Sequence, residues 1–297
     1  MKLRTLFAAA IMTGCTLSLS AQNDSTLLGM SELHVKYQVA QLCDYPNQWR
    51  QDDWRDTLTY ELDICDKAAV SESRASSLHE SSAEREQARP KVKVAHWQRD
   101  NWQGTVASGW KYFQMTKKIW PFSMNTQAQL GEVVIGLPEK GQLTRRVILD
   151  VAGLMEYSEP IPQMKWKVQS EHKTVLGYDC QRATCEFRGR KWEAWFAAAI
   201  PASYGPYKFG GLPGLILDLE DSTHEWHFTA QEVGRPATPR LMVYRHYDAE
   251  KMDHKRLMKK EKLLNLNHTA FAQDYGATIK MDGMEIGSMP YYPLEMK

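Results

Sequence analysis

Carboxylates and imidazoles gather in one short stretch of this chain, between residues 218 and 227. Asp218, Glu220 and Asp221 could supply the acid and the base of a hydrolase. On a β-strand, Asp218 and Glu220 would share one face at a separation of about 7 Å, which is compatible with acid–base chemistry. The alternative, which we favour, makes them the polar side of a half-buried strand. The inward side chains of that strand would be Leu215, Leu217 and Leu219.

Other reactive residue types predict no further active site. His224 and His227 are three apart, so a regular strand would aim them at opposite faces, and we predict no metal site. No Gly-x-Ser-x-Gly sequence marks a serine nucleophile, and Cys180 and Cys185 are expected to be structural. The glycines near Gly210 lead into a strand instead of a helix, so we expect no phosphate loop and no cofactor.

Large aromatic side chains lie around residues 192–226 and could form a binding surface or pack the core. They are Trp192, Trp195, Tyr204, Tyr207, Phe209 and Trp226. Trp192 and Trp195 are three apart and face opposite sides of a strand, so one of them is expected to line a groove or cavity. Core packing is the favoured interpretation of the set, and a ligand surface is the alternative.

Alternation of apolar and polar residues predicts β-strands through most of the chain. Residues 33–43 and 58–64 have a period of two and are expected to pair as a hairpin with a long loop. Further strands are predicted at 92–97, 110–115, 147–151, 164–169, 178–187, 191–197, 215–220, 225–233 and 241–247. Because a meander of this size must curl to hide one face, we predict a mainly β protein with a large curved antiparallel sheet, half-barrel or barrel-like. A two-sheet sandwich is the alternative.

Two segments between the strands have a different composition. Residues 248–264 predict a C-terminal helix with Asp248 as its N-cap. Its lysines indicate a solvated face, with an anionic membrane surface as the alternative. Residues 121–143 are punctuated by glycine and proline, so we expect turns there.

The most distinctive run of the chain is Gly211-Leu212-Pro213-Gly214-Leu215-Ile216. Pro213 and Gly214 fit the two central positions of a type II turn, in which glycine accepts a positive φ. Nearby glycines mark further positions where a side chain would be costly or would block close packing. These are Gly205, Gly210 and Gly211. We expect the run to be a structural motif that leads into an apolar strand.

This motif and its surroundings resemble the GLPGLI family of exported proteins, known chiefly from Bacteroidota. Upstream, the resemblance includes Tyr157-Ser158-Glu159-Pro160 and Gly177-Tyr178-Asp179-Cys180-Gln181-Arg182-Ala183. Downstream, it includes the closing run Pro290-Tyr291-Tyr292-Pro293-Leu294-Glu295, in which Tyr292 replaces the family's usual asparagine. The resemblance implies an uncharacterised envelope protein, and it carries over no catalytic residue and no ligand.

The N-terminus has the layout of a secretory signal peptide. Lys2 and Arg4 precede an apolar run, and cleavage is expected after Ala21, which leaves residues 22–297 as a single domain. Residues 12–15 also resemble a lipobox, so a lipid anchor on Cys15 is the alternative. No later segment reaches the roughly 20 apolar residues of a membrane-spanning helix. We therefore expect a protein of the periplasm or the outer membrane surface.

Charge and cysteine content agree with this location. The chain has 37 basic and 36 acidic residues, and loss of Lys2 and Arg4 leaves 35 against 36. The charges are interspersed, so we expect no nucleic-acid partner. An oxidising compartment permits disulfides, and Cys43 with Cys65 is the most natural local pair.

These observations favour a non-enzymatic function. We expect binding of an apolar ligand or of an envelope partner, with a link to outer-membrane transport as one form of it. The alternative is an envelope hydrolase that uses Asp218, Glu220 and Asp221.

Overall fold

The computed structural model describes residues 25–42, 55–73, 118–119, 132–149, 152–238, 240–276, 285–286 and 291–297. The N-terminal strands are β1 (Ser25–Met30), β2 (Leu33–Leu42), β3 (Arg55–Ile64), β4 (Ala69–Ser73), β5 (Lys118–Ile119), β6 (Glu132–Leu137), β7 (Gln142–Leu149) and β8 (Gly153–Pro160). The later strands are β9 (Lys167–Val175), β10 (Tyr178–Phe187), β11 (Arg190–Ala197), β12 (Leu215–Asp221), β13 (Trp226–Gly234), β14 (Leu241–Arg245), β15 (Glu250–Lys251) and β16 (Glu285–Ile286). The strands predicted at 92–97 and 110–115 lie outside the described residues.

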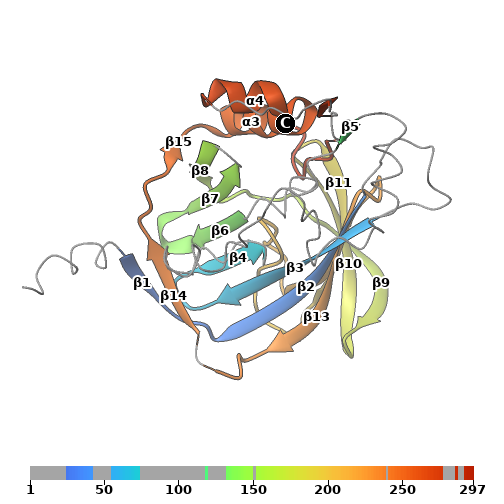
Figure 1. Ribbon diagram of the computed structural model, residues 1–297. Coiled ribbons are helices and arrows are strands. Elements are labelled where there is room, and N and C mark those ends of the chain that lie inside the picture. Colours follow the sequence, from blue (N-terminus) through green and yellow to red (C-terminus); the bar gives the residue numbers. More distant parts are fainter. Residues whose placement is uncertain are drawn as a thin grey trace, which may run out of the picture.

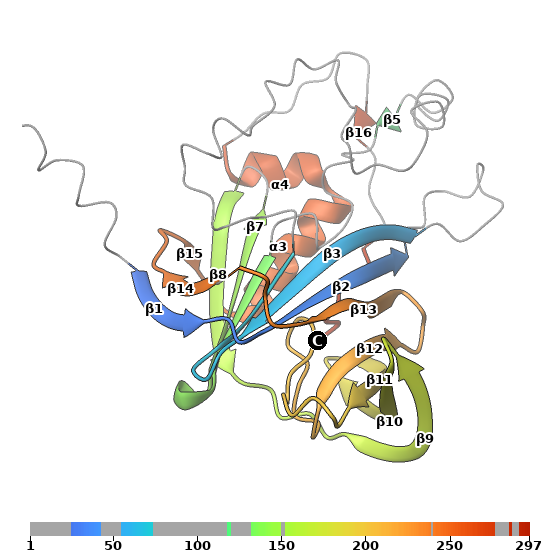
Figure 2. The same cartoon turned by 90° about the horizontal axis from the view of Figure 1, so that it is seen from below.

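Twelve of the described strands form one sheet, in the order β15-β8-β7-β6-β4-β3-β2-β13-β12-β11-β10-β9. Neighbouring strands run antiparallel except for β15 and β8, which are parallel. The sheet curves through a wide arc without closing, so β9 and β15 are its edges (Figures 1 and 2). β1 with β14, and β5 with β16, form two small sheets. The predicted large curved sheet is confirmed, and it replaces the two-sheet sandwich.

The alternating patterns of the sequence correspond to the core of this sheet. In β2, Val35, Tyr37 and Val39 are fully buried. β2 pairs with β3 over its whole length, with Tyr37 opposite Tyr60, as the predicted hairpin requires. The buried hydroxyl of Tyr37 cannot reach water and needs a partner within the protein. It donates a hydrogen bond to the carbonyl oxygen of Ile216 at 2.7 Å.

The prediction of turns over residues 121–143 is wrong for its last part, which contains β6. Val133, Val134 and Ile135 are all buried there. A strand that is covered on both faces is apolar throughout and lacks the alternation by which a half-buried strand is recognised. The glycines near β6 also made the segment resemble a series of turns. One of these glycines, Gly136, lies within the strand, where a Cβ would come within 3.6 Å of the carbonyl oxygen of Ala69.

Two helices cover one end of the sheet, α3 (His254–Leu266) and α4 (His268–Asp274) (Figure 1). α3 is the predicted helix, but its N-cap is Asp253 instead of Asp248, and the Asp253 carboxylate accepts a hydrogen bond from the Arg256 amide at 2.8 Å. The apolar side chains of the two helices pack on β7 and β8. The contacts involve Leu257, Leu264 and Phe271 against Val147, Leu149, Met155 and Tyr157. Within the described residues, neither helix has the length and apolar character to span a membrane.

A buried ion cluster fastens α3 to the sheet. The Arg145 guanidinium donates to Glu132 at 2.9 Å and to Glu261 of α3 at 2.6 Å. All three side chains are at most 2% exposed. Burial raises the pKa of Glu132, and the charge of Arg145 opposes that shift. The cluster therefore depends on Arg145, which separates two carboxylates that would otherwise repel each other.

The segment Gly211–Ile216 has a turn that differs from the one expected. Gly214 does not have a positive φ, whereas Gly211 has a φ of 87°. Glycine is required at position 214 because a Cβ there would lie only 2.3 Å from the carbonyl oxygen of Ala197. The prediction for Gly210 is confirmed, since a Cβ there would lie 2.8 Å from the carbonyl oxygen of Ser203. The motif thus holds its loop against the end of β11, and buries Leu212, Leu215 and Ile216.

Residues 291–297, which we call the C-terminal tail, cross the core next to this loop. The indole of Trp226 donates to the Tyr292 carbonyl at 3.0 Å, and Arg190 donates to the Pro293 carbonyl at 2.9 Å. Leu294 is 1% exposed and belongs to the main core. The tail therefore fills space that belongs to the core of the sheet.

Lys208 connects the motif loop to the tail. Its side chain is fully buried, and the ammonium group lies 2.6 Å from Glu295 and 2.7 Å from Glu159 of β8. It also hydrogen-bonds the Tyr157 hydroxyl. Burial disfavours ionisation of Glu295, but the charge of Lys208 and a hydrogen bond from His254 outweigh it and lower the pKa of that carboxyl. One cation thus joins the loop, β8 and the tail.

The predicted disulfide between Cys43 and Cys65 does not form, because Cys65 is a free, buried thiol. Cys43 itself lies outside the described residues. Leu42, the residue before it, pairs with Arg55, whereas Cys65 follows Ile64 at the other end of β3. Ten residues of strand span about 30 Å, far beyond the reach of a disulfide. In an antiparallel hairpin the far ends of the two strands never meet.

Replacement of Lys208 is expected to destabilise the fold. Lys208→Met removes the fully buried cation between Glu159 and Glu295 and leaves them with the more exposed Arg188. Breaking such a buried cluster typically costs about 3–5 kcal/mol of unfolding free energy. Urea unfolding followed by circular dichroism measures this loss. Lys297→Gln, at an exposed position of the tail, is the matched control. Equal stability of the two variants would contradict the role given to Lys208.

Candidate functional site

Strands β10, β11 and β12 present two different faces, because side chains alternate along each strand. Across the three strands, Ala183, Ala194 and Leu219 lie in one row and are fully buried. We call this side the core face. The residues before and after these three in each strand point to the opposite side of the sheet, which we call the polar face. The polar face carries Arg182, Thr184, Glu193, Trp195, Asp218 and Glu220, together with His227 and Thr229 of β13.

The structure does not bring the three predicted carboxylates together. Asp218 and Glu220 share the polar face, as their spacing predicted. Asp221 is in the next row, on the core face, and is 1% exposed. It accepts hydrogen bonds from Arg190 at 2.9 Å and from the amide of Trp226 at 2.7 Å. Asp221 therefore ties β12 to β11 and closes the turn into β13, and the single cleft expected of the hydrolase alternative is not formed.

Asp218 lies between a histidine and a lysine on the polar face. It lies 3.2 Å from His227 and 3.2 Å from Lys173. Burial disfavours its ionised form, but the hydrogen bond from His227 and the charge of Lys173 outweigh burial and lower its pKa. The same hydrogen bond raises the pKa of His227. Lys173 also lies over the ring of Trp195 at 4.6 Å, so the group forms one packed cluster.

The geometry of this cluster does not match a nucleophile and its base. Thr229 is 3.1 Å from His227, but it contacts Nε2, the same ring nitrogen that contacts Asp218. In a catalytic triad, the acid and the nucleophile use opposite nitrogens of the imidazole. This arrangement therefore gives Thr229 no route to pass its proton through the ring.

The two histidines near the motif have separate partners. His224 lies 2.7 Å from Glu220, whereas His227 contacts Asp218. Within the part of the chain that the structure describes, no three metal-ligating side chains converge.

The six aromatic residues divide between the core and its margin. Trp192, Tyr207, Phe209 and Trp226 are at most 4% exposed and belong to the main core. Trp192 and Phe209 pack edge to face with ring centroids 4.7 Å apart. Trp195 and Tyr204 are partly buried. Four of the six are thus core residues, which agrees with the favoured interpretation, and Trp195 lies on the polar face opposite to Trp192.

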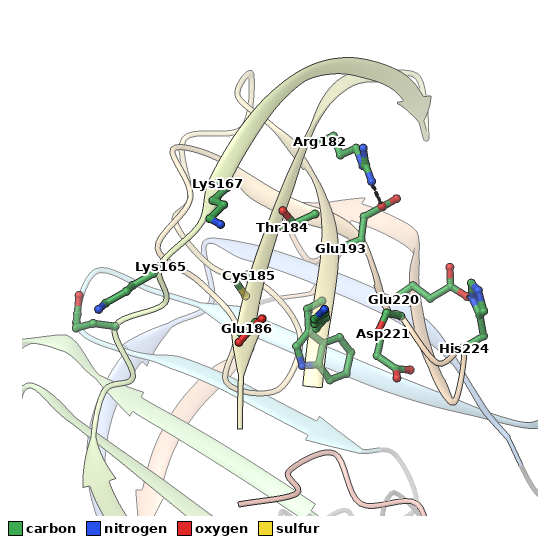
Figure 3. A pocket seen from close by; sticks show the side chains of 14 residues that line it. Lys165, Lys167, Arg182, Thr184, Cys185, Glu186, Glu193, Glu220, Asp221 and His224 are labelled. Carbon is green, nitrogen blue, oxygen red and sulfur yellow. Dashed lines mark hydrogen bonds and ion pairs between the residues drawn. The ribbon is translucent and has the colours of Figure 1, made fainter. Parts of the chain in front are cut away.

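An open groove of about 960 Å³ runs over β10–β12 and is lined mainly by polar and charged side chains (Figure 3). The segment that leads into β9 supplies Gln163, Lys165 and Lys167 on one side. The floor is Thr184, Glu193 and Glu220, which follow one another across the sheet, and Lys167 stands directly opposite Thr184. The far wall is the turn that contains Ser222 and His224.

Most of the groove's negative charge is already paired. Arg182 binds Glu193 at 2.7 Å, the ion pair that is drawn as a dashed line in Figure 3. Glu220 is paired with His224, and Asp221 with Arg190. In contrast, the lysines of the groove have no ion pair with any residue that the structure describes. They are Lys165, Lys167 and Lys191.

Sequence reasoning missed these lysines because nothing in their local pattern separates them from ordinary surface charges. Lys165 and Lys167 alternate with Met164, Trp166 and Val168, as lysines on the solvent side of any strand do. They line the same groove as Lys191 only because β9, β10 and β11 are neighbours in the folded sheet. Lys165 and Lys167 are labelled in Figure 3.

Cys180 and Cys185 are both buried free thiols, in agreement with a structural role. Burial raises the pKa of Cys180 to about 11 and that of Cys185 to about 12. At neutral pH neither forms the thiolate that a nucleophile or a metal ligand requires.

Comparisons with known proteins add one local match. A family model described as "Protein of unknown function (Porph_ging)" matches residues 186–218, a stretch that includes Gly211–Ile216. No curated protein matches the chain. The match shows similarity to an uncharacterised family around the motif, and the resemblance to the GLPGLI family stays a prediction.

Among solved structures, the chain is similar to two that are described as "Structure of PNGF-II in P21 space group" and "Structure of PNGF-II in C2 space group". The sequence identities are 12% and 11%, and the TM-scores are 0.43 and 0.42. The alignments cover 78% and 79% of this chain but 34% of each PNGF-II chain. The chain therefore spans about a third of the length of those structures.

The pairing of Asp218 with His227 predicts a measurable titration. We expect His227 to titrate above the usual value of about 6.5, and Asp218→Asn to bring its pKa back down. Two-dimensional NMR of the imidazole protons measures both. Glu139→Gln, at an exposed position in the turn between β6 and β7, is the control. An unchanged His227 pKa in Asp218→Asn would show that the pair does not interact in solution.

The same pair predicts how stability depends on pH. A raised pKa in the folded state means that His227 stabilises the fold below pH of about 6.5, and that this contribution is lost as the pH rises through the folded value. The lowered pKa of Asp218 contributes above pH of about 3.9 and is lost as the pH falls through its folded value. Urea unfolding across this range should show both losses reduced in Asp218→Asn.

The two thiols on β10 are expected to resist alkylation. At pH 8, iodoacetamide should leave Cys180 and Cys185 largely unmodified in the folded protein and modify both in urea, because only the thiolate reacts. Peptide mass mapping assigns the modified sites. Thr26→Cys, at an exposed position of β1, is the positive control. Rapid modification of either native thiol would show that β10 opens locally.

Proposed function

We propose that this chain is an exported binding protein that holds a segment of a partner protein in the groove over β10–β12. The observation that carries the proposal is the groove itself, which is open, lined by polar and charged side chains from three elements, and built on strands whose other face is firmly packed. Export is supported by the signal-peptide layout of residues 1–21.

The character of the groove favours a protein partner over an apolar ligand. An apolar ligand needs an apolar lining with few polar groups. In this groove, the large apolar side chain is Trp192, which is 1% exposed. The concave side of the sheet offers little room either, because the motif loop and the C-terminal tail fill it with Phe209, Leu212 and Leu294. Of the two expected ligand classes, we therefore retain the envelope partner.

Binding without catalysis also fits the placement of the carboxylates. Asp218 is committed to His227 and Lys173, and Asp221 holds Arg190 beneath the groove. Groups engaged in this way stabilise the platform on which a partner would rest.

Site-specific photocrosslinking in cells that naturally produce the protein tests the proposal. A photoreactive amino acid placed at Thr184 or Ser222, in the groove, should give a discrete adduct with one protein, identified by mass spectrometry. The same amino acid at Lys140, in an exposed turn away from the groove, is the control. The absence of an adduct at both groove positions, or the same adducts at Lys140, would refute the proposal.

A further inference from the structure

The groove carries a charge pattern that specifies its occupant more closely. Three lysines of the groove have no ion-pair partner in the described part of the chain. Lys165 and Lys167, from the segment before β9 and from its start, lie at one side, whereas Lys191 lies on β11, where its carbonyl accepts a hydrogen bond from Ser222 of the far wall. Lys191 has carboxylates near it, Glu186 directly opposite and Glu193 two residues along the same strand. The excess of positive charge is therefore at the β9 side of the groove, where it attracts an anion.

The floor and the far wall lack such an excess of positive charge. Glu193 is paired with Arg182, and Glu220 lies 2.7 Å from His224. A uniform polyanion that crossed the groove would meet these carboxylates. An occupant that is anionic only at the β9 side matches the groove better.

The dimensions of the floor indicate over what distance the charge of such an occupant changes. Lys167, Thr184, Glu193 and Glu220 lie opposite one another on four successive strands. Strands about 4.8 Å apart place Lys167 and Glu220 roughly 14 Å from each other, the length of about four residues of extended peptide. A polypeptide can change charge over that length, whereas a sulfated polymer or a nucleic acid repeats one charge.

The other groups of the groove suit a peptide backbone. Gln163, Thr184 and Ser222 offer both hydrogen-bond donors and acceptors. The aromatic ring of the lining, Trp192, is buried and offers no stacking platform of the kind on which single-stranded nucleic acids rest.

From these observations, and resting on the proposed function, we infer that the groove binds an extended peptide whose acidic side chains lie against Lys165, Lys167 and Lys191.

Fluorescence anisotropy with short synthetic peptides tests this inference. The probe is a labelled peptide of about ten residues that contains a run of glutamates, and its comparison is the same peptide with glutamines. The glutamate peptide should bind the full-length protein more tightly, and its affinity should fall as salt is added, because exposed charges are screened. The triple variant Lys165→Gln, Lys167→Gln and Lys191→Gln should weaken binding about tenfold or more.

A second triple variant with the same loss of charge is the matched control. Lys140→Gln, Lys251→Gln and Lys262→Gln changes exposed lysines outside the groove lining and should leave the affinity unchanged. Circular dichroism checks that both variants are folded. Equal affinity for the two peptides, or equal loss in the two triple variants, overturns the inference. Failure of the glutamate peptide to bind overturns it as well, including the case in which a sulfated oligosaccharide binds instead.

The crosslinking experiment separates this inference from the proposed function. If Thr184 and Ser222 still crosslink to the partner in the groove triple variant at undiminished yield, the partner site stands and the charge assignment is wrong. If neither position crosslinks in the wild-type protein, the proposed function itself fails.

Discussion

A buried ammonium group organises this molecule. Once Lys208 lies inside the core, its charge has to be met there, because an isolated buried cation costs far more than the fold can spare. Its partners come from β8 and from the C-terminal tail, at distances of 2.7 Å and 2.6 Å. Arg145 has the same effect where α3 meets the sheet. The helix and the tail thus each place a carboxylate against a buried cation, and for the tail that cation is Lys208 of the motif loop.

This internal scaffold explains why the groove lies on β10–β12. The core faces of these strands are held by the motif loop, which needs Gly214 for its close approach to Ala197, and by Arg190, which contacts both Asp221 and the tail. Because their core faces are packed in this way, these strands can expose polar side chains on the opposite face without further apolar packing there. The packed core beneath that face fixes its backbone, so its side chains lie on a rigid support.

The sequence supported the prediction of the fold better than that of the site. Alternation revealed β2, β3 and β10 because each has one covered face, whereas β6 has no alternation and was missed. The turn at Pro213-Gly214 was predicted from local preference alone. The actual constraint on Gly214 is the carbonyl oxygen of Ala197, seventeen positions earlier in the chain, which only the folded structure brings near. The wrong pairing of Cys43 with Cys65 could have been avoided, since antiparallel order already separates them.

The groove could not be predicted because its parts carry no local signal. Lys165, Lys167 and Lys191 look like ordinary surface lysines in the sequence, and they line one groove only because β9, β10 and β11 are neighbours in the sheet. The aromatic residues near the motif attracted attention for a sound reason, their size, but size equally favours burial, and four of them lie in the core. The contact of Asp218 with His227 depends on the register between β12 and β13. Alternation of apolar and polar residues does not determine that register, so the contact could not be predicted.

The C-terminal tail also bears on how the chain reaches its native state. β2 contacts the tail through Gln41 and Tyr292, which are 251 positions apart, and β2 pairs with β13, far along the chain. Contacts over such separations form late, because a long loop must close before they bring any gain. Without residues 291–297, Lys208 would lack Glu295 and the main core would lack Leu294. The strands and the motif loop therefore complete their shared core only when this segment has docked, so its docking is expected to be one of the last steps of folding.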